Sequence, residues 1–336
     1  MKEKYTLEVR SIGHDFHDPN WQEATPIYIK HWKAAEQKLS VREYEVAGST
    51  VTVRCNWRSV AKKYSTELEI LGDIERARKS RDASQINAAY SRISLDALRI
   101  NVLTTCDGNK APTLSVAECF VHDTFLIMNL SAPGSMNLYK VRLGDHSFSL
   151  GNMYFALSFL DRDGDTWPRV GVVEFDKVLN WYFRIRCGVS QIPTNRMEKV
   201  LFSLLHLSSA IDTPAAVIWI FYGLETIFDT RPGENRRALI ERCELLLQPT
   251  ARERKLLREN MRRLYDVSVV HGGLEVVHPM HNESLDEAVD TKWREISRAC
   301  EFGFRLLLCA VQRTIEHGWQ APTFKEVMEG APFQNS

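Results

Sequence analysis

Basic side chains gather in one stretch of the sequence, ARERKLLRENMRRLYDVSVV, over residues 251–270. The chain as a whole has 43 Lys and Arg and 43 Asp and Glu, so its formal net charge is zero and this positive stripe is local. Such a stripe suits the phosphate backbone of RNA, and it equally suits a solvated helix face. The basic residues of this stretch are Arg252, Arg254, Lys255, Arg258, Arg262 and Arg263.

His271 follows this stretch and is itself followed by Gly272 and Gly273. An imidazole titrates near neutral pH, so it can take up and release a proton during catalysis. It can also serve as a cationic cap at the negative end of a helix that a glycine terminates. From these residues alone the capping role is the stronger interpretation.

Other ligand-type side chains form no complete site. Residues 14–18 (HDFHD) have no second half of a metal site, and residues 161–165 (DRDGD) lack the closing Glu of a calcium loop. We interpret the first as a surface loop, the second as a turn, and His278 and His281 as loop residues. The seven cysteines are odd in number and include no C-x-x-C pair, which argues against a zinc site and a disulfide framework. We therefore expect no metal and no cofactor.

Several enzyme classes lack sequence support. The chain contains no G-x-S-x-G, G-x-x-x-x-G-K-[ST], H-E-x-x-H or G-x-G-x-x-G motif, so a hydrolase triad, an ATPase, a zinc protease and a Rossmann dehydrogenase are not indicated. The first residues have no apolar signal-peptide core, and the most apolar run, 215–224, has about half the length needed to span a bilayer. We expect a cytoplasmic protein with no membrane partner.

The first half of the chain reads as mixed α and β. Alternating apolar residues and turn signals predict strands, and an apolar run over 113–130 predicts a buried helix, although it could also serve a strand. The charged stretch 73–95 fits an exposed helix or a long loop. The predicted strands are 5–11, 43–55 with a turn at 47–49, 65–72, 98–105, 137–143, 146–151 and 169–175.

From Thr194 onward the periodicity is helical. The stretch 215–229 is apolar almost all round, so it should be the central helix of a bundle. We therefore predict an α+β fold with an α+β sensing or target-binding module over 1–190, an all-α bundle over 191–328 and a tail over 329–336. The predicted helices of the bundle are 195–211, 215–229, 236–247, 251–270 and 285–318.

Two helices of this bundle carry a recognisable order of residues. Trp219, Leu224 and Glu225 lie on the first, and the motif Tyr265-Asp266 followed by Val270-His271-Gly272 ends the second. This order resembles the HEPN superfamily, most closely its Apea-like branch, across roughly the last 140 residues. The segment 117–136 also looks like the front domain of some Apea-like proteins, with a less specific match.

The resemblance implies a metal-independent RNA endonuclease of the antiviral defence or toxin class. In that family an Arg and a His at one helix end face their counterparts across a homodimer. The His moves a proton, the Arg holds the scissile phosphate through paired hydrogen bonds, and the 2′-OH is the nucleophile. The implied partners are a second copy of the chain, RNA such as tRNA, and a phage or protein trigger.

The sequence departs from the family at the Arg. The family places it four to six residues before the His, where this chain has Leu264, Tyr265 and Asp266. The nearest candidates are Arg263 and Arg262. On an ideal helix, Arg263 and His271 are about 80° apart around the axis and about 12 Å apart along it, so they share a face without touching.

Roles follow from this comparison. We assign catalysis to His271 with Arg263 or Arg262, and RNA binding to Arg258, Arg254 and Lys255. Supporting roles fall to Glu225, Tyr265 and Asp266. Glu225, in a very apolar helix, should pair with an Arg of the following helices, and Tyr265 should pack in the core. The alternative is a catalytically silent bundle that binds RNA or a protein and serves for dimerisation.

Overall fold

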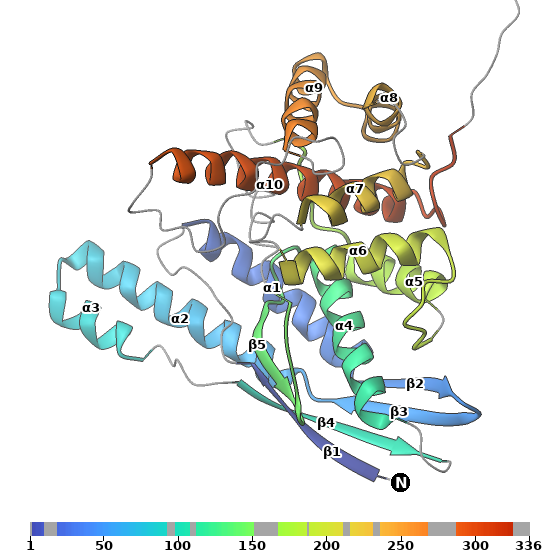
Figure 1. The fold of residues 1–336 in the computed structure, drawn as a ribbon. Helices are drawn as coiled ribbons and strands as arrows, with labels where there is room; N and C mark the ends of the chain where they lie inside the picture. The colour runs from blue at the N-terminus through green and yellow to red at the C-terminus, as the bar shows by residue number, and fades with distance from the viewer. Residues whose placement is uncertain are drawn as a thin grey trace, which may run out of the picture.

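The computed structural model describes most of the chain as an α+β protein, with an antiparallel sheet at one end and stacked helices above it (Figure 1). The ranges that it describes are 2–9, 19–92, 98–107, 112–150, 167–186, 188–210, 216–230, 236–267 and 287–324.

The sheet has six strands in the order β2-β3-β4-β1-β5-β6, and neighbouring strands run antiparallel. β2 and β3 form a hairpin through Ala47 and Gly48, whose φ angles of 50° and 77° suit the tight turns that a twisted hairpin favours. The strands are β1 (Lys2–Val9), β2 (Val41–Val46), β3 (Ser49–Cys55), β4 (Leu98–Cys106), β5 (Leu138–Leu143) and β6 (His146–Leu150).

One face of the sheet is covered. In β4 every second side chain is buried, namely Ile100, Val102, Thr104 and Cys106, while Arg99 and Asn101 on the other face are not. This period of two is typical of an antiparallel sheet that packs on the core with one side. The covering helix is α4 (Thr113–Ser131), which contacts β3, β4 and β5 (Figure 1).

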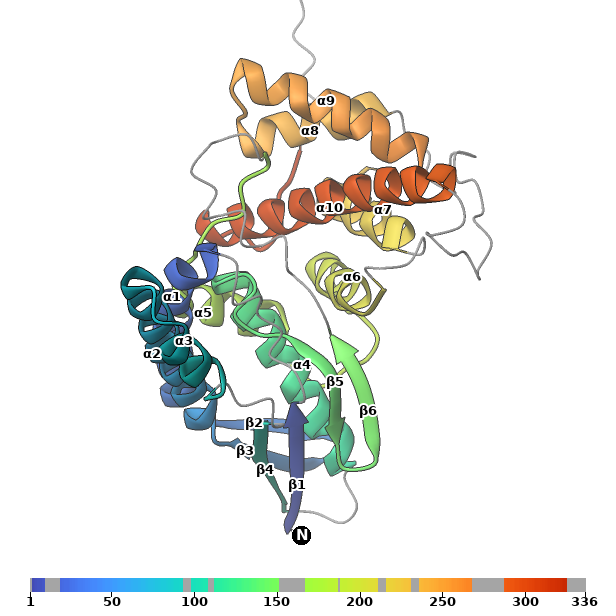
Figure 2. The ribbon, with the colours of Figure 1, turned by 90° about the vertical axis from the view of Figure 1, so that its left-hand side faces the viewer.

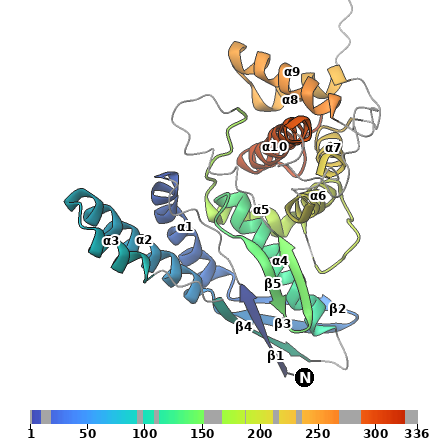
Figure 3. The same cartoon turned by 60° about the vertical axis from the view of Figure 1, so that its left-hand side comes forward.

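Four further helices belong to the first part of the chain: α1 (Pro19–Lys38), α2 (Arg58–Ser80), α3 (Ala83–Tyr90) and α5 (Phe175–Ile185). α2 and α3 pack on each other and extend away from the rest of the molecule (Figure 3). α1 joins them to the core, because it contacts both α2 and α4.

A group of buried aromatic residues fixes α1, α2 and the turn after α4. The ring of Trp57 lies 5.5 Å from that of Trp32 and 6.0 Å from that of Phe120, measured between centroids. The indole of Trp32 and the phenol of Tyr64 both donate to the carbonyl oxygen of Ser135, at 2.9 Å each. The buried polar ends of these rings therefore have partners, as a dense core requires.

Within the described ranges, the second part of the chain is a bundle of five helices. α7 and α10 form a layer between α6 on the sheet side and the α8–α9 pair, which lies farthest from the sheet (Figures 1 and 2). The helices are α6 (Arg196–Ala210), α7 (Ala216–Ile227), α8 (Arg236–Leu247), α9 (Ala251–Asp266) and α10 (Glu287–Glu316).

The two parts share a hydrophobic core. One cluster of buried side chains extends from Leu7 in β1 to Ile315 in α10, and a second, small cluster of Ile70, Ile74 and Ala89 lies between α2 and α3. The amide nitrogen of Gln312 in α10 also donates to the carbonyl oxygens of Leu130 and Gly171, at 2.9 and 2.8 Å. The change from mixed to all-helical structure near residue 190 agrees with the predicted fold class. The division into separate domains at that residue stays a prediction, and the tail 329–336 lies outside the described ranges.

Two predicted strands are wrong. The stretch 65–72 is part of α2, where Tyr64, Glu67, Ile70, Leu71 and Ile74 are buried at helical spacing. The stretch 169–175 has no strand partner, because its backbone groups pair with the end of α4 and with Gln312 instead. Within 73–95, α2 and α3 show that the described residues 73–80 and 83–90 are helical.

None of the helices in the described ranges has both the length and the apolar character needed to cross a membrane.

Candidate functional site at the end of helix α9

The two motif helices of the bundle contact each other directly. The ring of Tyr265 in α9 packs edge-on against Phe221 in α7, with 4.8 Å between centroids and 79° between the ring planes. The neighbouring residue, Leu264, lies close to Gly303 in α10. The structure thus brings together Glu225 and Tyr265, which the sequence separates by 40 positions.

Tyr265 is half-buried in a charged environment. Burial, and then the nearby carboxylate of Glu225, raise its pKa to about 12, and Arg236 in the first turn of α8 opposes this. The phenol therefore stays protonated at neutral pH and can donate a hydrogen bond. Packing of Tyr265 agrees with the prediction that it lies in the core. Arg236, at the start of the next helix, lies close enough to Tyr265 for its charge to lower the pKa of the phenol.

Arg262 and Arg263 are exposed in the last turn of α9. Arg263 donates to the amide oxygen of Asn260 at 3.2 Å. Arg262 lies 3.7 Å from the carboxylate of Asp266, a long ion pair between side chains that are both mainly in solvent. Exposed pairs of this kind contribute about 0–1 kcal/mol, so a stronger anion can displace them.

Three other basic residues of α9 also have partners within the described ranges. Arg258 donates through two nitrogens to one oxygen of Glu244, at 3.2 and 3.0 Å, which ties α9 to α8. Lys255 lies 3.9 Å from Glu259, and Arg254 donates to the carbonyl oxygen of Pro249. Carboxylates thus lie beside Arg258, Lys255 and Arg262, whereas Arg254 and Arg263 donate to neutral oxygens.

The start of α9 shows why the helix begins where it does. Thr250 accepts a hydrogen bond from the backbone of Glu253, and the Glu253 carboxylate accepts one from the backbone of Thr250. This capping box is encoded by T-x-x-E. The described helix ends at Asp266, whereas the sequence predicted it to residue 270. Residues 268–286 lie outside the described ranges, and with them His271, Gly272, His278 and His281.

A second group of polar residues, which the sequence analysis assigned no role, lines a hollow of about 390 Å³ between α4, β6 and α6. We call it the α4 cavity. Its lining residues are Ser115, Glu118, Cys119, His122 and Asp123 of α4, Phe148 to Leu150 of β6, Arg186 and Gln191 after α5, and Phe202, Leu205, His206 and Ser209 of α6. The sequence signal was the presence of Glu118, His122 and Asp123 within an otherwise apolar helix, where charged groups need partners.

A buried ion pair forms the floor of this cavity. One oxygen of Asp123 accepts from Tyr182 at 2.7 Å and from Arg186 at 2.8 Å, and the other accepts from Tyr44 at 3.2 Å. Glu198 in α6 lies 3.8 Å from the same guanidinium. Burial raises the pKa of Asp123, while Arg186 and the two phenols oppose the rise. The carboxylate is therefore held by three donors from α5, β2 and the residue that follows α5.

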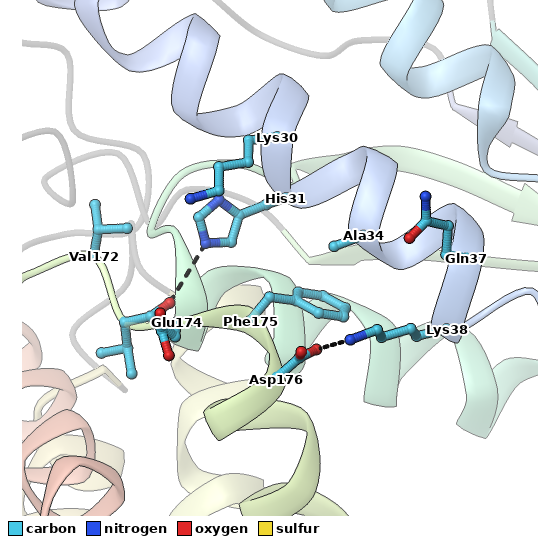
Figure 4. Close-up of a pocket in the computed structure, with 10 residues that line it drawn as sticks. Lys30, His31, Ala34, Gln37, Lys38, Val172, Glu174, Phe175 and Asp176 are labelled. Atoms are coloured by element: carbon cyan, nitrogen blue, oxygen red, sulfur yellow. Dashed lines mark hydrogen bonds and ion pairs between the residues drawn. The ribbon is translucent and has the colours of Figure 1, made fainter.

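A third hollow, of about 290 Å³, lies between α1 and the start of α5 (Figure 4). Its ionic groups are largely used within the protein. Lys38 pairs with Asp176, and the ring of His31 lies between the carbonyl oxygens of Ile27 and Val173, at 2.8 and 3.4 Å (Figure 4). These contacts connect α1 to the segment before α5, which is a structural role.

Metal ligands do not gather in the described part of the chain: it contains no group of three or more His, Cys, Asp or Glu side chains that could hold a metal ion. The candidate loops 14–18 and 161–165 lie outside the described ranges.

Comparisons with models of protein families, with curated proteins and with solved structures returned no match for this chain.

Proposed function

We propose that this protein is a HEPN-type, metal-independent RNA endonuclease of the antiviral defence or toxin class that acts as a homodimer in the cytoplasm. The observation that carries the proposal is the contact between the two helices of the resemblance. Tyr265 packs on Phe221, and it lies close enough to Glu225 for that carboxylate to raise its pKa. α9 then ends with two exposed arginines, directly before the segment that contains His271.

The chemistry needs a base, an acid and a fixed positive charge. In the proposed dimer, the His271 of one protomer takes the proton of the 2′-OH, and that of its partner protonates the leaving 5′-oxygen. A guanidinium holds the non-bridging oxygens of the phosphate and stabilises the charge that develops on them.

Arg263 is the better candidate for the phosphate contact. Its side-chain partner in the structure is a neutral amide, so its charge is not offset by a carboxylate at that contact. Arg262 has the carboxylate of Asp266 at 3.7 Å, and a phosphate would have to compete with it. We therefore rank Arg263 above Arg262, although both lie upstream of the position that the family uses.

The outer face of α7 supports the proposed dimer. Ile218 and Tyr222 are 47% and 41% exposed, and they are four residues apart, so they share a face. Glu225 follows three residues later on the same face. A second copy seated on this face would cover two apolar side chains close to the motif residues.

A second candidate function is an RNA-binding module without catalysis. The absence of an Arg at 264–266 favours it, because the family's catalytic Arg would stand at one of these positions. Such a module would bind RNA as the proposed nuclease does, but it would transfer no proton and cut no strand.

The test is cleavage of total RNA and tRNA by the purified protein in EDTA. We expect His271→Ala and the Arg262→Ala/Arg263→Ala double variant each to lower the rate by about 100-fold or more. The matched control is Arg237→Ala, which removes an exposed arginine on α8 and should leave the rate within twofold.

Gel filtration and RNA binding of the same samples separate the two candidates. A folded dimer that binds RNA and cleaves none supports the module. Cleavage that survives in His271→Ala contradicts the proposed catalytic role.

A further inference from the structure

The α4 cavity has the size and the construction of a site for a small ligand. Its volume of about 390 Å³ falls within the range of roughly 300–1,000 Å³ that such sites occupy. Its walls come from α4, β6, α6 and the segment after α5, which are distant in sequence, and none of the described residues of α7 to α10 lines it. A ligand of the α4 cavity would therefore bind away from the α9 site.

The charges of the cavity favour an uncharged or cationic occupant. Asp123 and Arg186 are paired with each other at 2.8 Å, so together they add no net charge. Glu118 is the remaining acidic group of the wall. Its Oε2 lies 3.1 Å from Nδ1 of His146, and its Oε1 accepts no hydrogen bond from the residues that the structure describes. A phosphate would be repelled here, whereas an N–H donor would be attracted.

The remaining wall suits a flat ring. The ring of Phe148 lies edge-on to that of His122, with 4.9 Å between centroids. The guanidinium carbon of Arg186 lies over the ring of Phe202, 5.0 Å from its centroid. Leu150 and Leu205 extend the apolar surface. Aromatic walls with a few polar groups at fixed positions are the usual means of binding heterocycles.

His122 supplies a further polar group. Burial lowers its pKa, so its ring is neutral at pH 7 and one nitrogen is an acceptor. Its Nε2 is buried and has no hydrogen-bond partner among the described residues. A buried polar atom without a partner costs about 1–3 kcal/mol, so a donor that reaches the inner wall would relieve this cost.

We infer that the α4 cavity binds an uncharged or cationic flat nitrogen heterocycle with N–H donors, the chemical class of nucleobases and nucleosides without phosphate. Glu118 accepts the donors, Phe148 and Phe202 flank the ring, and His122 completes the inner wall. This inference goes beyond the proposed nuclease function and does not depend on it.

The test is calorimetric titration of the full chain with adenosine, cytidine, guanosine and uridine, and with guanosine 5′-monophosphate. Saturable binding is expected, tightest for guanosine, whose two neighbouring N–H groups can bridge both oxygens of a carboxylate. The monophosphate should bind at least about tenfold more weakly, because its charge is repelled. No binding of any of the four nucleosides, or equal binding of the monophosphate, would overturn the inference.

Two variants locate the binding. Glu118→Gln keeps the shape of the wall and should weaken guanosine about tenfold, while Glu241→Gln on the exposed face of α8 should leave it unchanged. Ser209→Trp on α6 should fill the cavity mouth and abolish binding in a protein whose circular dichroism spectrum is unchanged. Unaltered affinity in Glu118→Gln would contradict the assignment. RNA is absent from these titrations, so their failure would leave the nuclease proposal standing.

Discussion

Two buried carboxylates of this protein, Asp123 and Glu67, differ in how many hydrogen-bond donors surround them. Asp123 is buried with three donors around its carboxylate. Glu67 in α2 is 7% exposed, its Oε2 has no partner within the described ranges, and Lys63 lies 3.9 Å from its other oxygen. We therefore expect opposite changes in the free energy of unfolding when each carboxylate is replaced by the neutral amide.

Replacing Glu67 with Gln should stabilise the protein at neutral pH. Burial raises the pKa of Glu67 from 4.5 to about 7. Between these values the unfolded chain has lost the proton and the folded chain keeps it, so this residue lowers stability as the pH rises through that window. We expect Glu67→Gln to raise the unfolding free energy by about 2–3 kcal/mol at pH 7.5 and by little at pH 4.5. Urea titrations at both pH values measure this, and an equal gain at both would contradict the explanation.

At the scale of elements, the bundle depends on close contacts at two helix glycines. A Cβ at Gly223 in α7 would lie 2.5 Å from Leu307, and one at Gly303 in α10 would lie 2.6 Å from Ile220 and 3.1 Å from Leu264. Since Leu264 belongs to α9, Gly303 is where α10 approaches both motif helices. The positions of Tyr265 and of Arg262 and Arg263 in the preceding turn depend on this packing.

Gly303→Ala should therefore destabilise the protein by about 1–3 kcal/mol, because the methyl group forces α10 away from its neighbours. Gly72→Ala is the matched control. It also lies within a helix, but its Cβ would meet only the flexible end of Arg76 at 3.4 Å, so the gain in helix propensity of up to about 1 kcal/mol should dominate. Thermal unfolding of both variants decides the matter. Destabilisation of similar size in both would show that the close approach is not the cause.

The elements also show what the sequence could predict. The helices of the bundle were found because periodicity over 12 or more residues is unambiguous, and the predicted range 236–247 coincides with α8. The stretch 65–72 was misassigned because a short window hid the helical spacing of Tyr64, Glu67, Ile70 and Leu71. The α4 cavity could not be predicted, because its walls come from four segments that are separate in the sequence. His271, Arg262 and Arg263 were proposed from the sequence. The structure describes the positions of the two arginines, whereas His271 lies outside the described ranges.

At the scale of the whole molecule, one hydrophobic core runs through the sheet and the bundle. Asp123 and Arg186 sit at this junction, with contacts to Tyr44 in β2, Tyr182 in α5 and Glu198 in α6. An isolated bundle would lose these partners. We therefore expect the described parts to unfold together.

Asp123→Asn should destabilise both parts at once, by about 3–5 kcal/mol, because it removes the closer carboxylate from a buried guanidinium. Hydrogen exchange should show amides of α4 and of α10 losing protection equally. The control is Asp176→Asn, whose exposed pair with Lys38 should be worth less than about 1 kcal/mol. Loss of protection confined to α4 would contradict a single cooperative unit.

We propose that RNA is cut at the end of α9 through its own 2′-OH. The most direct measurement is the chemistry of the product ends formed in EDTA, together with cleavage of the same strand carrying 2′-deoxyribose at the mapped position. Our account predicts a 2′,3′-cyclic phosphate, a free 5′-hydroxyl and no cut in the deoxy-substituted strand. Products with a 5′-phosphate and a 3′-hydroxyl, or cleavage of the substituted strand, would contradict it.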